Sequence, residues 1–223
     1  MNLDTILCEG TSVTSSGTTG LSKTIYRDAN NLQACIDVAN LVQDITPSSK
    51  ILTVTKMTHA GGLLLQTLPA HAISADYTIV KFNPYNFINQ LKEHSHTFLT
   101  PSMIESLSNT KAFKSADFTN KFISMGSAPI PAIHVNWFTE RGATVLCNWG
   151  MSEVGPCAIN KRFEPYEKCD SDNIIGDKYW CDVEIVNQQL FVRGDICVYN
   201  GWFATKDNVY KDNGIIYYKG RTK

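Results

Sequence analysis

Val13-Thr-Ser-Ser-Gly-Thr-Thr-Gly-Leu-Ser-Lys23 is the stretch on which the interpretation of this chain depends. Gly17 and Gly20 bracket two threonines, and serines stand on both sides. Glycine has no Cβ, so the backbone N–H groups of such a segment can approach an anion closely. Lys23 adds a compact positive charge that suits a phosphate. The same composition is typical of a flexible linker, so the residues alone leave two interpretations open.

The position of this stretch keeps a phosphate-binding loop open beside the linker. It follows a short apolar run, Ile6-Leu7-Cys8, and precedes Thr24-Ile25-Tyr26, and we expect both runs to be strands. The spacing Gly-x-x-x-x-Gly-Lys-[Ser/Thr], which marks the Walker loop, is absent from the stretch. Any phosphate site here is therefore of another kind.

Composition and charge describe an ordinary globular protein. The 223 residues are 43% hydrophobic and 18% charged, enough for one domain or two small ones. A net charge of -1 gives no electrostatic reason to expect nucleic acid or an anionic membrane as a partner. We find neither an apolar run long enough to span a membrane nor a secretory signal. Seven cysteines without a Cys-x-x-Cys pair favour reduced thiols in the cytoplasm over a zinc site.

Hydrophobic spacing predicts an α/β fold with a mostly parallel sheet covered by helices on both faces. The expected strands of this layer are 50–54, 77–81, 97–99, 121–125 and 143–147, and the expected helices are 28–45, 59–68, 83–94, one from 101 and 131–141. After Trp149 the pattern changes to short strands at 156–160, 181–186, 189–193, 195–199 and 215–218, with hairpin turns at 188–189 and 212–214. We therefore expect an α/β core over residues 1–150 and a smaller β-rich part over 151–223.

Two further segments follow predicted strands, where ligands of open parallel sheets bind. Gly126-Ser-Ala128 lies between a strand and a helix, and Asn148-Trp-Gly-Met-Ser-Glu153 follows the last strand of the layer. An aromatic ring can stack on a purine, a hydroxyl can bind phosphate and a carboxylate can hold Mg²⁺. Alternatively, the first segment is an ordinary connection, Trp149 belongs to the core and Glu153 is a surface charge.

The order Ser-Ser-Gly-Thr-Thr-Gly-Leu-Ser-Lys closely resembles the signature loop of the adenylate-forming superfamily, which includes acyl-CoA synthetases. That loop usually reads [Ser/Thr]-Ser/Gly-Gly-Thr-Thr-Gly-x-Pro-Lys and wraps the β- and γ-phosphates of ATP. Ser22 stands where proline is commonest. The resemblance implies the superfamily's large-domain core and a site for ATP or AMP with Mg²⁺.

Four other segments carry the same resemblance to the nucleotide site. Gly126-Ser-Ala128 is similar to a Gly-Gly-Ala-Pro turn that lines the adenine pocket, and Trp149 to Glu153 are similar to Tyr-Gly-x-Thr-Glu. Gly201-Trp-Phe-Ala-Thr-Lys-Asp207 resembles Gly-Trp…Thr-Gly-Asp, with Lys206 in place of glycine, and Gly220-Arg221 resembles the Gly-Arg that ends the large domain. The resemblance assigns to the nucleotide Ser15, Ser16, Gly17, Thr18, Thr19, Gly20, Lys23, Gly126, Ser127, Ala128, Asn148, Trp149, Gly150, Met151, Ser152, Asp207 and Arg221.

The remaining roles also come from the resemblance. Glu153 would hold the metal, and Lys23, Ser152 and Glu153 would be catalytic. His59-Ala-Gly-Gly resembles a segment that borders the acyl pocket, so the candidates for contact with the acid are His59, Gly61 and Met125.

The implied reaction is Mg²⁺- and ATP-dependent, AMP-forming activation of a carboxylic acid, as in acyl-CoA synthetases. Superfamily members also carry a long region before the loop and a mobile C-terminal domain with the adenylation lysine, and this sequence stops at that hinge. We therefore keep as alternatives a catalytically impaired module that binds nucleotide or acyl-adenylate with a partner chain, and an assembly protein. Coenzyme A and a trans-acting partner domain are compatible partners, and uncovered surface favours a homo-oligomer.

Overall fold

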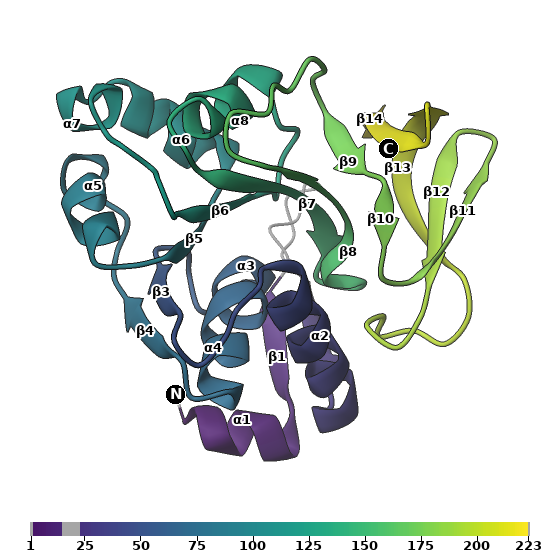
Figure 1. The fold of residues 1–223 in the computed structure, drawn as a ribbon. Helices are drawn as coiled ribbons and strands as arrows, with labels where there is room; N and C mark the ends of the chain where they lie inside the picture. Colours follow the sequence, from purple (N-terminus) through teal and green to yellow (C-terminus); the bar gives the residue numbers. More distant parts are fainter. Residues whose placement is uncertain (1, 15–22, 223) are drawn as a thin grey trace.

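The computed structural model describes residues 2–14 and 23–222, which form three β-sheets of two, seven and five strands, with helices around the largest one. The helices are α1 (Leu3–Glu9), α2 (Ala29–Val42), α3 (Ala60–Gly62), the π-helical segment η1 (Leu63–Thr67), α4 (Leu68–Ala72), α5 (Pro84–Lys92), α6 (Pro101–Ser108), α7 (Lys111–Lys114) and α8 (Ala132–Thr139). Figure 1 shows α1–α4 below the large sheet, α5–α8 above it and the small sheet at the C-terminal side.

The large sheet has seven strands in the order β10-β8-β7-β6-β5-β3-β4. The strands are β3 (Lys50–Thr53), β4 (Asp76–Ile79), β5 (His96–Leu99), β6 (Phe122–Met125), β7 (Thr144–Met151), β8 (Gly155–Phe163) and β10 (Lys178–Tyr179). β4, β3, β5, β6 and β7 run parallel, whereas β8 and β10 are antiparallel to their neighbours. The predicted mostly parallel sheet is thus confirmed. This sheet takes strands from both sides of residue 150, and the division into two domains stays a prediction.

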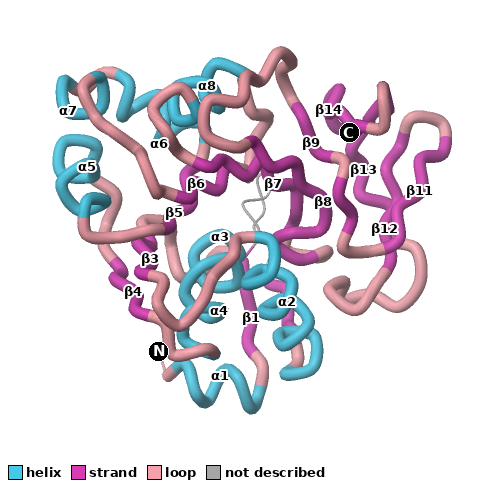
Figure 2. Tube along the Cα trace, in the orientation of Figure 1, coloured by secondary structure: helices cyan, strands magenta, loops and turns pink. Residues whose placement is uncertain are grey.

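Helices cover both faces of this sheet because its strands are apolar on both faces. Successive residues of a strand point to opposite faces. Leu99 and Ile123 accordingly pack in the core under α5–α8, whereas their neighbours Phe98 and Phe122 pack with Leu65 of η1 and with α2. The helices that Figure 2 shows on both sides of the strands therefore cover the two apolar faces of the large sheet.

The small sheet is antiparallel, with the strand order β11-β12-β13-β14-β9. Its strands are β9 (Ile174–Gly176), β11 (Asp182–Val186), β12 (Gln189–Arg193), β13 (Phe203–Asp212) and β14 (Ile215–Arg221). Leu190 and Val209 of this sheet share one buried cluster with Ile159 of β8. That shared core fixes the small sheet against the end of the large one.

Four predicted elements differ from the structure. Ile6–Cys8 lie in helix α1 and not in a strand, because the Asn2 side chain accepts from two N–H groups of the first turn and starts a helix there. Residues 195–199 form turns and bends and not the predicted strand. The strand β13 begins at Phe203, in a segment where no strand was predicted. The first hairpin turn lies at 187–188, one residue earlier than expected, and the helix from 28 ends at Val42. The hairpin turn at Asn213–Gly214 is confirmed.

Two other expectations concern the chain as a whole. No helix within residues 2–14 and 23–222 is long and apolar enough to cross a membrane. All seven cysteines lie in the described ranges and are free thiols. Burial raises the pKa of Cys181 to about 12 and that of Cys197 to about 11. These thiols therefore stay protonated at neutral pH.

Candidate functional site

The predicted phosphate loop is closed at its base by a two-stranded hairpin. β1 (Thr11–Thr14) and β2 (Thr24–Arg27) are antiparallel, and Thr14 lies opposite Thr24. The two ends of the loop are thereby held side by side. Lys23, next to the paired end, is exposed. The predicted nucleotide residues Ser15, Ser16, Gly17, Thr18, Thr19 and Gly20 lie outside the described residues.

His59 lies against the first stem residue of this loop. Its Nδ1 is 3.0 Å from the carbonyl oxygen of Thr14, and both the amide and the hydroxyl of Thr14 donate to the carbonyl of Thr58. A carbonyl oxygen only accepts, so Nδ1 is the donor and Nε2 is left to face other groups. His59 is also the residue before α3, as expected for a helix start. The structure thus supplies the orienting partner that the sequence did not indicate.

The other two predicted acid-contacting residues differ in their surroundings. A Cβ on Gly61 would lie 2.7 Å from the ring of Phe98, so glycine here lets α3 approach β5 closely. Met125 has no exposed surface and packs in the core under α5–α8. Packing in the core therefore accounts for Met125, and its contact with an acid stays a prediction.

Three predicted nucleotide residues from distant segments meet at one carboxylate. The Trp149 indole N–H donates to Asp207 Oδ2 at 2.9 Å, and Arg221 Nε donates to Asp207 Oδ1 at 2.6 Å. Asp207 is 2% exposed, and the Arg221 side chain is 33% exposed. Burial alone would lower the pKa of Arg221, but the hydrogen bond and charge of Asp207 raise it above the ordinary value. Each carboxylate oxygen keeps acceptor capacity for a further donor.

Ser152 and Glu153 form the tight turn between β7 and β8, and each is 8% exposed. The carbonyl of Ser152 accepts from Arg27 Nη2 at 2.7 Å, and the carbonyl of Glu153 accepts from the amide of Val198 at 3.0 Å. The backbone of this turn is therefore fixed from two sides. Arg27, at the end of β2, was not predicted, because an arginine between Tyr26 and Asp28 carries no pattern that sets it apart from a surface charge.

The segment Gly126-Ser-Ala128 lies next to the residues around Trp149. A Cβ on Gly126 would stand 2.5 Å from the carbonyl oxygen of Asn148, and one on Gly150 would stand 2.2 Å from that of Gly155. These two glycines permit the close approach of β6, β7 and β8. The Asn148 side chain donates to the carbonyl of Pro156, and its buried Oδ1 has no protein partner. Met151 lies half-buried in the core that joins the two sheets.

Two substitutions in the superfamily patterns fall at left-handed backbone positions. Ser127 has a φ of 68° and Lys206 a φ of 65°, and each occupies a place where the resembling motif has glycine. Glycine adopts this region without strain, unlike residues with a Cβ. Both positions therefore have a backbone conformation that glycine would adopt without strain. Lys206 is exposed, whereas its neighbour Asp207 is buried.

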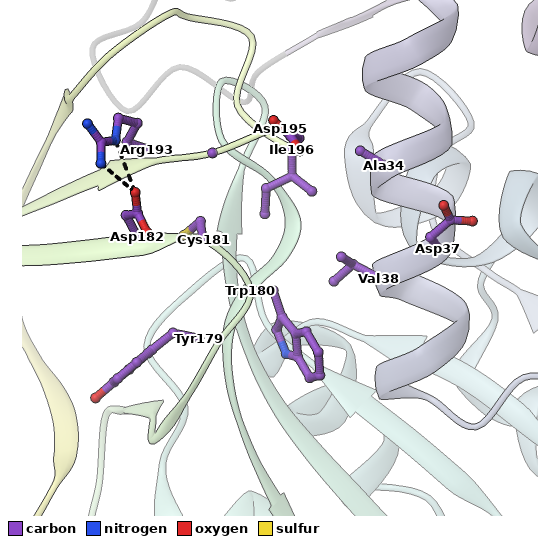
Figure 3. A pocket seen from close by; sticks show the side chains of 11 residues that line it. Ala34, Asp37, Val38, Tyr179, Trp180, Cys181, Asp182, Arg193, Asp195 and Ile196 are labelled. Atoms are coloured by element: carbon purple, nitrogen blue, oxygen red, sulfur yellow. Dashed lines mark hydrogen bonds and ion pairs between the residues drawn. The ribbon is translucent and has the colours of Figure 1, made fainter.

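A hollow in the described part of the chain lies elsewhere. It has a volume of about 550 Å³ and opens between α2 and strands β10–β12, with Val38 and Trp180 on opposite walls (Figure 3). Its lining residues include no predicted site residue. The candidate site is thus defined by the cluster of Trp149, Asp207 and Arg221 with the turn at Ser152–Glu153.

The comparisons with known proteins agree with this fold. A protein-family model described as AMP-binding enzyme matches residues 13–204. An indoleacetate–CoA ligase of Aromatoleum aromaticum is 27% identical over an alignment 243 residues long, which covers 93% of this chain and 46% of the relative. Nicotinic acid-CoA ligase pyr1 of Aspergillus fumigatus is 26% identical, over 66% of this chain and 30% of the relative. The chain therefore spans at most about half the length of these curated relatives.

Solved structures show the same architecture. O-succinylbenzoate coenzyme A synthetase from Bacillus subtilis, in complex with ATP and magnesium, superimposes with a TM-score of 0.79 at 19% identity. That match covers 94% of this chain and 49% of the other. ATP-bound MatB from Rhodopseudomonas palustris gives a TM-score of 0.77 at 17% identity, over 94% and 47% of the two chains. At these identities the likeness establishes the fold.

Proposed function

The chain belongs to the AMP-binding enzyme family, and on that premise we propose that it binds ATP and converts a carboxylic acid to an acyl-adenylate. The observation that carries the proposal is the meeting of Trp149, Asp207 and Arg221 at one carboxylate. The three residues come from β7, β13 and β14, and each belongs to a different segment of the resemblance. Packing alone does not require a buried carboxylate with two donors at this place.

We propose that the nucleotide lies across the end of the large sheet. The ring of Trp149 would stack on adenine, and Asp207 and Arg221 would hold the ribose hydroxyls. The loop amides and Lys23 would bind the β- and γ-phosphates, with Ser152 as a further phosphate ligand. The turn at 126–128, together with Asn148, Gly150 and Met151, would border the adenine.

The residues present fit a magnesium ion that is held mainly by ATP. Mg²⁺ usually takes one or two carboxylates together with phosphate oxygens and water. In the described ranges no three His, Cys, Asp or Glu residues cluster as a metal cage, and Glu153 offers one carboxylate in a fixed turn. When bound, Mg²⁺ would neutralise charge on the phosphates.

The proposed chemical step is an in-line displacement at the α-phosphorus. An oxygen of the acid carboxylate forms a bond to that phosphorus, the bond to the bridging oxygen breaks, and pyrophosphate leaves with the electron pair. Lys23 and the loop amides stabilise the charge that develops on the leaving group. His59 and Gly61 would border the acid, and coenzyme A would be the acceptor suggested by the ligases among the relatives. The seven free thiols support a cytoplasmic location.

The test combines nucleotide binding with pyrophosphate release. We expect calorimetric titration with ATP and Mg²⁺ to give saturable binding, and Lys23→Ala to weaken it at least about tenfold, since a charged partner of phosphate is lost. Lys111→Ala, which removes an exposed lysine on α7, is the matched control and should leave binding unchanged. Pyrophosphate is then measured with indoleacetate, nicotinate, ferulate and aliphatic acids.

The outcomes separate the alternatives. Pyrophosphate release with at least one acid supports the ligase. Nucleotide binding without release from any acid would instead identify a binding module that works with a partner chain. If ATP and AMP give no heat and no shift in melting temperature, the nucleotide site is rejected.

A further inference from the structure

Arg27 is a buried arginine whose hydrogen-bond partners are all neutral. It is 1% exposed, and arginine is rarely buried to this extent without a paired carboxylate. Its Nη2 donates to the carbonyl of Ser152 at 2.7 Å, and its Nη1 donates to the carbonyl of Ile196 at 2.9 Å. Nη1 also contacts the side chains of Asn31 and Cys35.

These contacts join three segments of the proposed site. Arg27 ends the strand that leads out of the phosphate loop, four residues after Lys23. Ser152 belongs to the turn that carries Glu153, and Ile196 belongs to the connection whose Val198 amide donates to the carbonyl of Glu153. One planar guanidinium thus determines where the loop stem, the turn and this connection stand relative to one another.

Asn31 reinforces the same connection from α2. Its side-chain amide donates to the carbonyl of Asp195 at 2.6 Å and to that of Cys197 at 3.0 Å. The carbonyls of Asp195, Ile196 and Cys197 therefore all accept from side chains at the start of α2 or the end of β2. Of these contacts, the one from Arg27 to Ile196 is buried and the one from Asn31 to Cys197 is partly buried.

Glu153 of this turn is among the charges that influence the pKa of Arg27. Burial lowers the pKa of Arg27, and the negative charges that oppose this shift include Glu153. Glu153 also raises the pKa of Arg221, by less than Asp207 does. Glu153 is therefore among the charges that act on both Arg27 and Arg221.

We infer that Arg27 is a positioning residue for the Ser152–Glu153 turn, which it holds at a set place relative to the β1–β2 hairpin and the connection at Ile196. This inference rests on the proposed function, because the turn matters only if it meets a metal and a nucleotide. Arg27 itself would touch neither substrate. Residues that orient a metal ligand typically change metal affinity about tenfold to a hundredfold when they are replaced.

The variants are Arg27→Met, which removes charge and donors, and Arg27→Lys, which keeps the charge but loses the planar fork. The matched control is Arg141→Met. Arg141 also donates to two backbone carbonyls, those of Trp137 and Phe113, but it stands among α7 and α8. Affinity for ATP is measured by titration with Mg²⁺ and with EDTA, and amide hydrogen exchange is followed for residues 150–155.

We expect Arg27→Met to weaken ATP binding about tenfold or more with Mg²⁺ and much less with EDTA. The ATP affinity of Arg27→Lys with Mg²⁺ should lie between that of Arg27→Met and that of the natural protein. Exchange over 150–155 should become faster in both Arg27 variants and stay unchanged in Arg141→Met. A merely structural role would lower the melting temperature of all three variants but leave the ratio of the two ATP affinities unchanged, and that result would overturn the inference.

The readouts also distinguish failure of this inference from failure of the proposed function. If the natural protein binds no ATP, the proposed function fails, and with it the role of the turn. Exchange over 150–155 then still tests the anchoring, and unchanged exchange in Arg27→Lys would refute it. If Arg27→Met does not fold, Arg27→Lys alone decides through the same ratio and the same exchange.

Discussion

Replacement of Asp207 by asparagine tests whether the hydrogen bonds around Asp207 contribute to the free energy of unfolding. The asparagine side chain has nearly the same shape, but it offers one acceptor oxygen where the carboxylate offers two. Either the Trp149 N–H or the Arg221 guanidinium must then face an NH₂ group. Both donors lie within 2.9 Å of the carboxylate in the natural protein.

The magnitude follows from the burial of the partners. A hydrogen bond to a charged group contributes about 1.5–3 kcal/mol. Asp207 is only 2% exposed, but the Arg221 side chain is 33% exposed and water can replace part of its partner. We therefore expect Asp207→Asn to lower the free energy of unfolding by about 2–3 kcal/mol. With a urea m-value of about 2–3 kcal/mol/M, the midpoint should fall by about 1 M.

Asp182→Asn is the matched control. Asp182 also pairs with an arginine, Arg193, through two hydrogen bonds, but both side chains lie half-exposed at the surface (Figure 3). Such pairs contribute about 0–1 kcal/mol. Equilibrium unfolding in urea, followed by tryptophan fluorescence and circular dichroism, measures both variants. If Asp207→Asn shifts the midpoint no more than Asp182→Asn does, the hydrogen bonds around Asp207 do not contribute to the free energy of unfolding as expected.

Three further predictions concern the backbone and the thiols. Ser127→Gly and Lys206→Gly should each raise the free energy of unfolding by about 0.5–1 kcal/mol, because both positions have positive φ. The control Lys211→Gly, at an ordinary strand position of β13, should lower the free energy of unfolding. Equal shifts of the urea midpoint in the three variants would contradict this prediction. Gly150→Ala should lower the free energy of unfolding by about 1–3 kcal/mol, since the new Cβ would meet the carbonyl oxygen of Gly155 at 2.2 Å. An unchanged urea midpoint would show that β7 and β8 can move apart to accept the Cβ. At pH 8, a thiol reagent should label the exposed thiol of Cys8 first. Burial raises the pKa of Cys181 to about 12 and that of Cys197 to about 11, so the thiolate fractions of these two residues are low. Mass mapping of the labelled sites measures the order, and faster labelling of Cys197 than of Cys8 would refute the prediction.

Much of the α/β layer follows from local patterns. The strands at β3, β5, β6 and β7 are short apolar runs bounded by turn residues, and Asn213–Gly214 is a hairpin turn by chemistry alone. Helix α1 was missed because the run Ile6-Leu7-Cys8 is too short to show a period, so that the cap at Asn2 decided its conformation.

The candidate site could be predicted only as separate segments. The resemblance predicts Trp149, Glu153 and Asp207, whereas the contact of Trp149 with Asp207 depends on the core that joins the small sheet to β8. Arg27 was beyond sequence reasoning, because its burial arises from carbonyls at 152 and 196, more than a hundred residues away in the chain. The left-handed backbone at Lys206 was likewise hidden by the substitution of glycine.

The proposed nucleotide site is decided by a structure of the protein with ATP and Mg²⁺. We expect the ribose hydroxyls within about 3.2 Å of the Asp207 carboxylate, the adenine against Trp149 and the triphosphate directed toward the segment before Lys23. A nucleotide bound in the hollow between α2 and β10–β12, or ribose density away from Asp207, would contradict it.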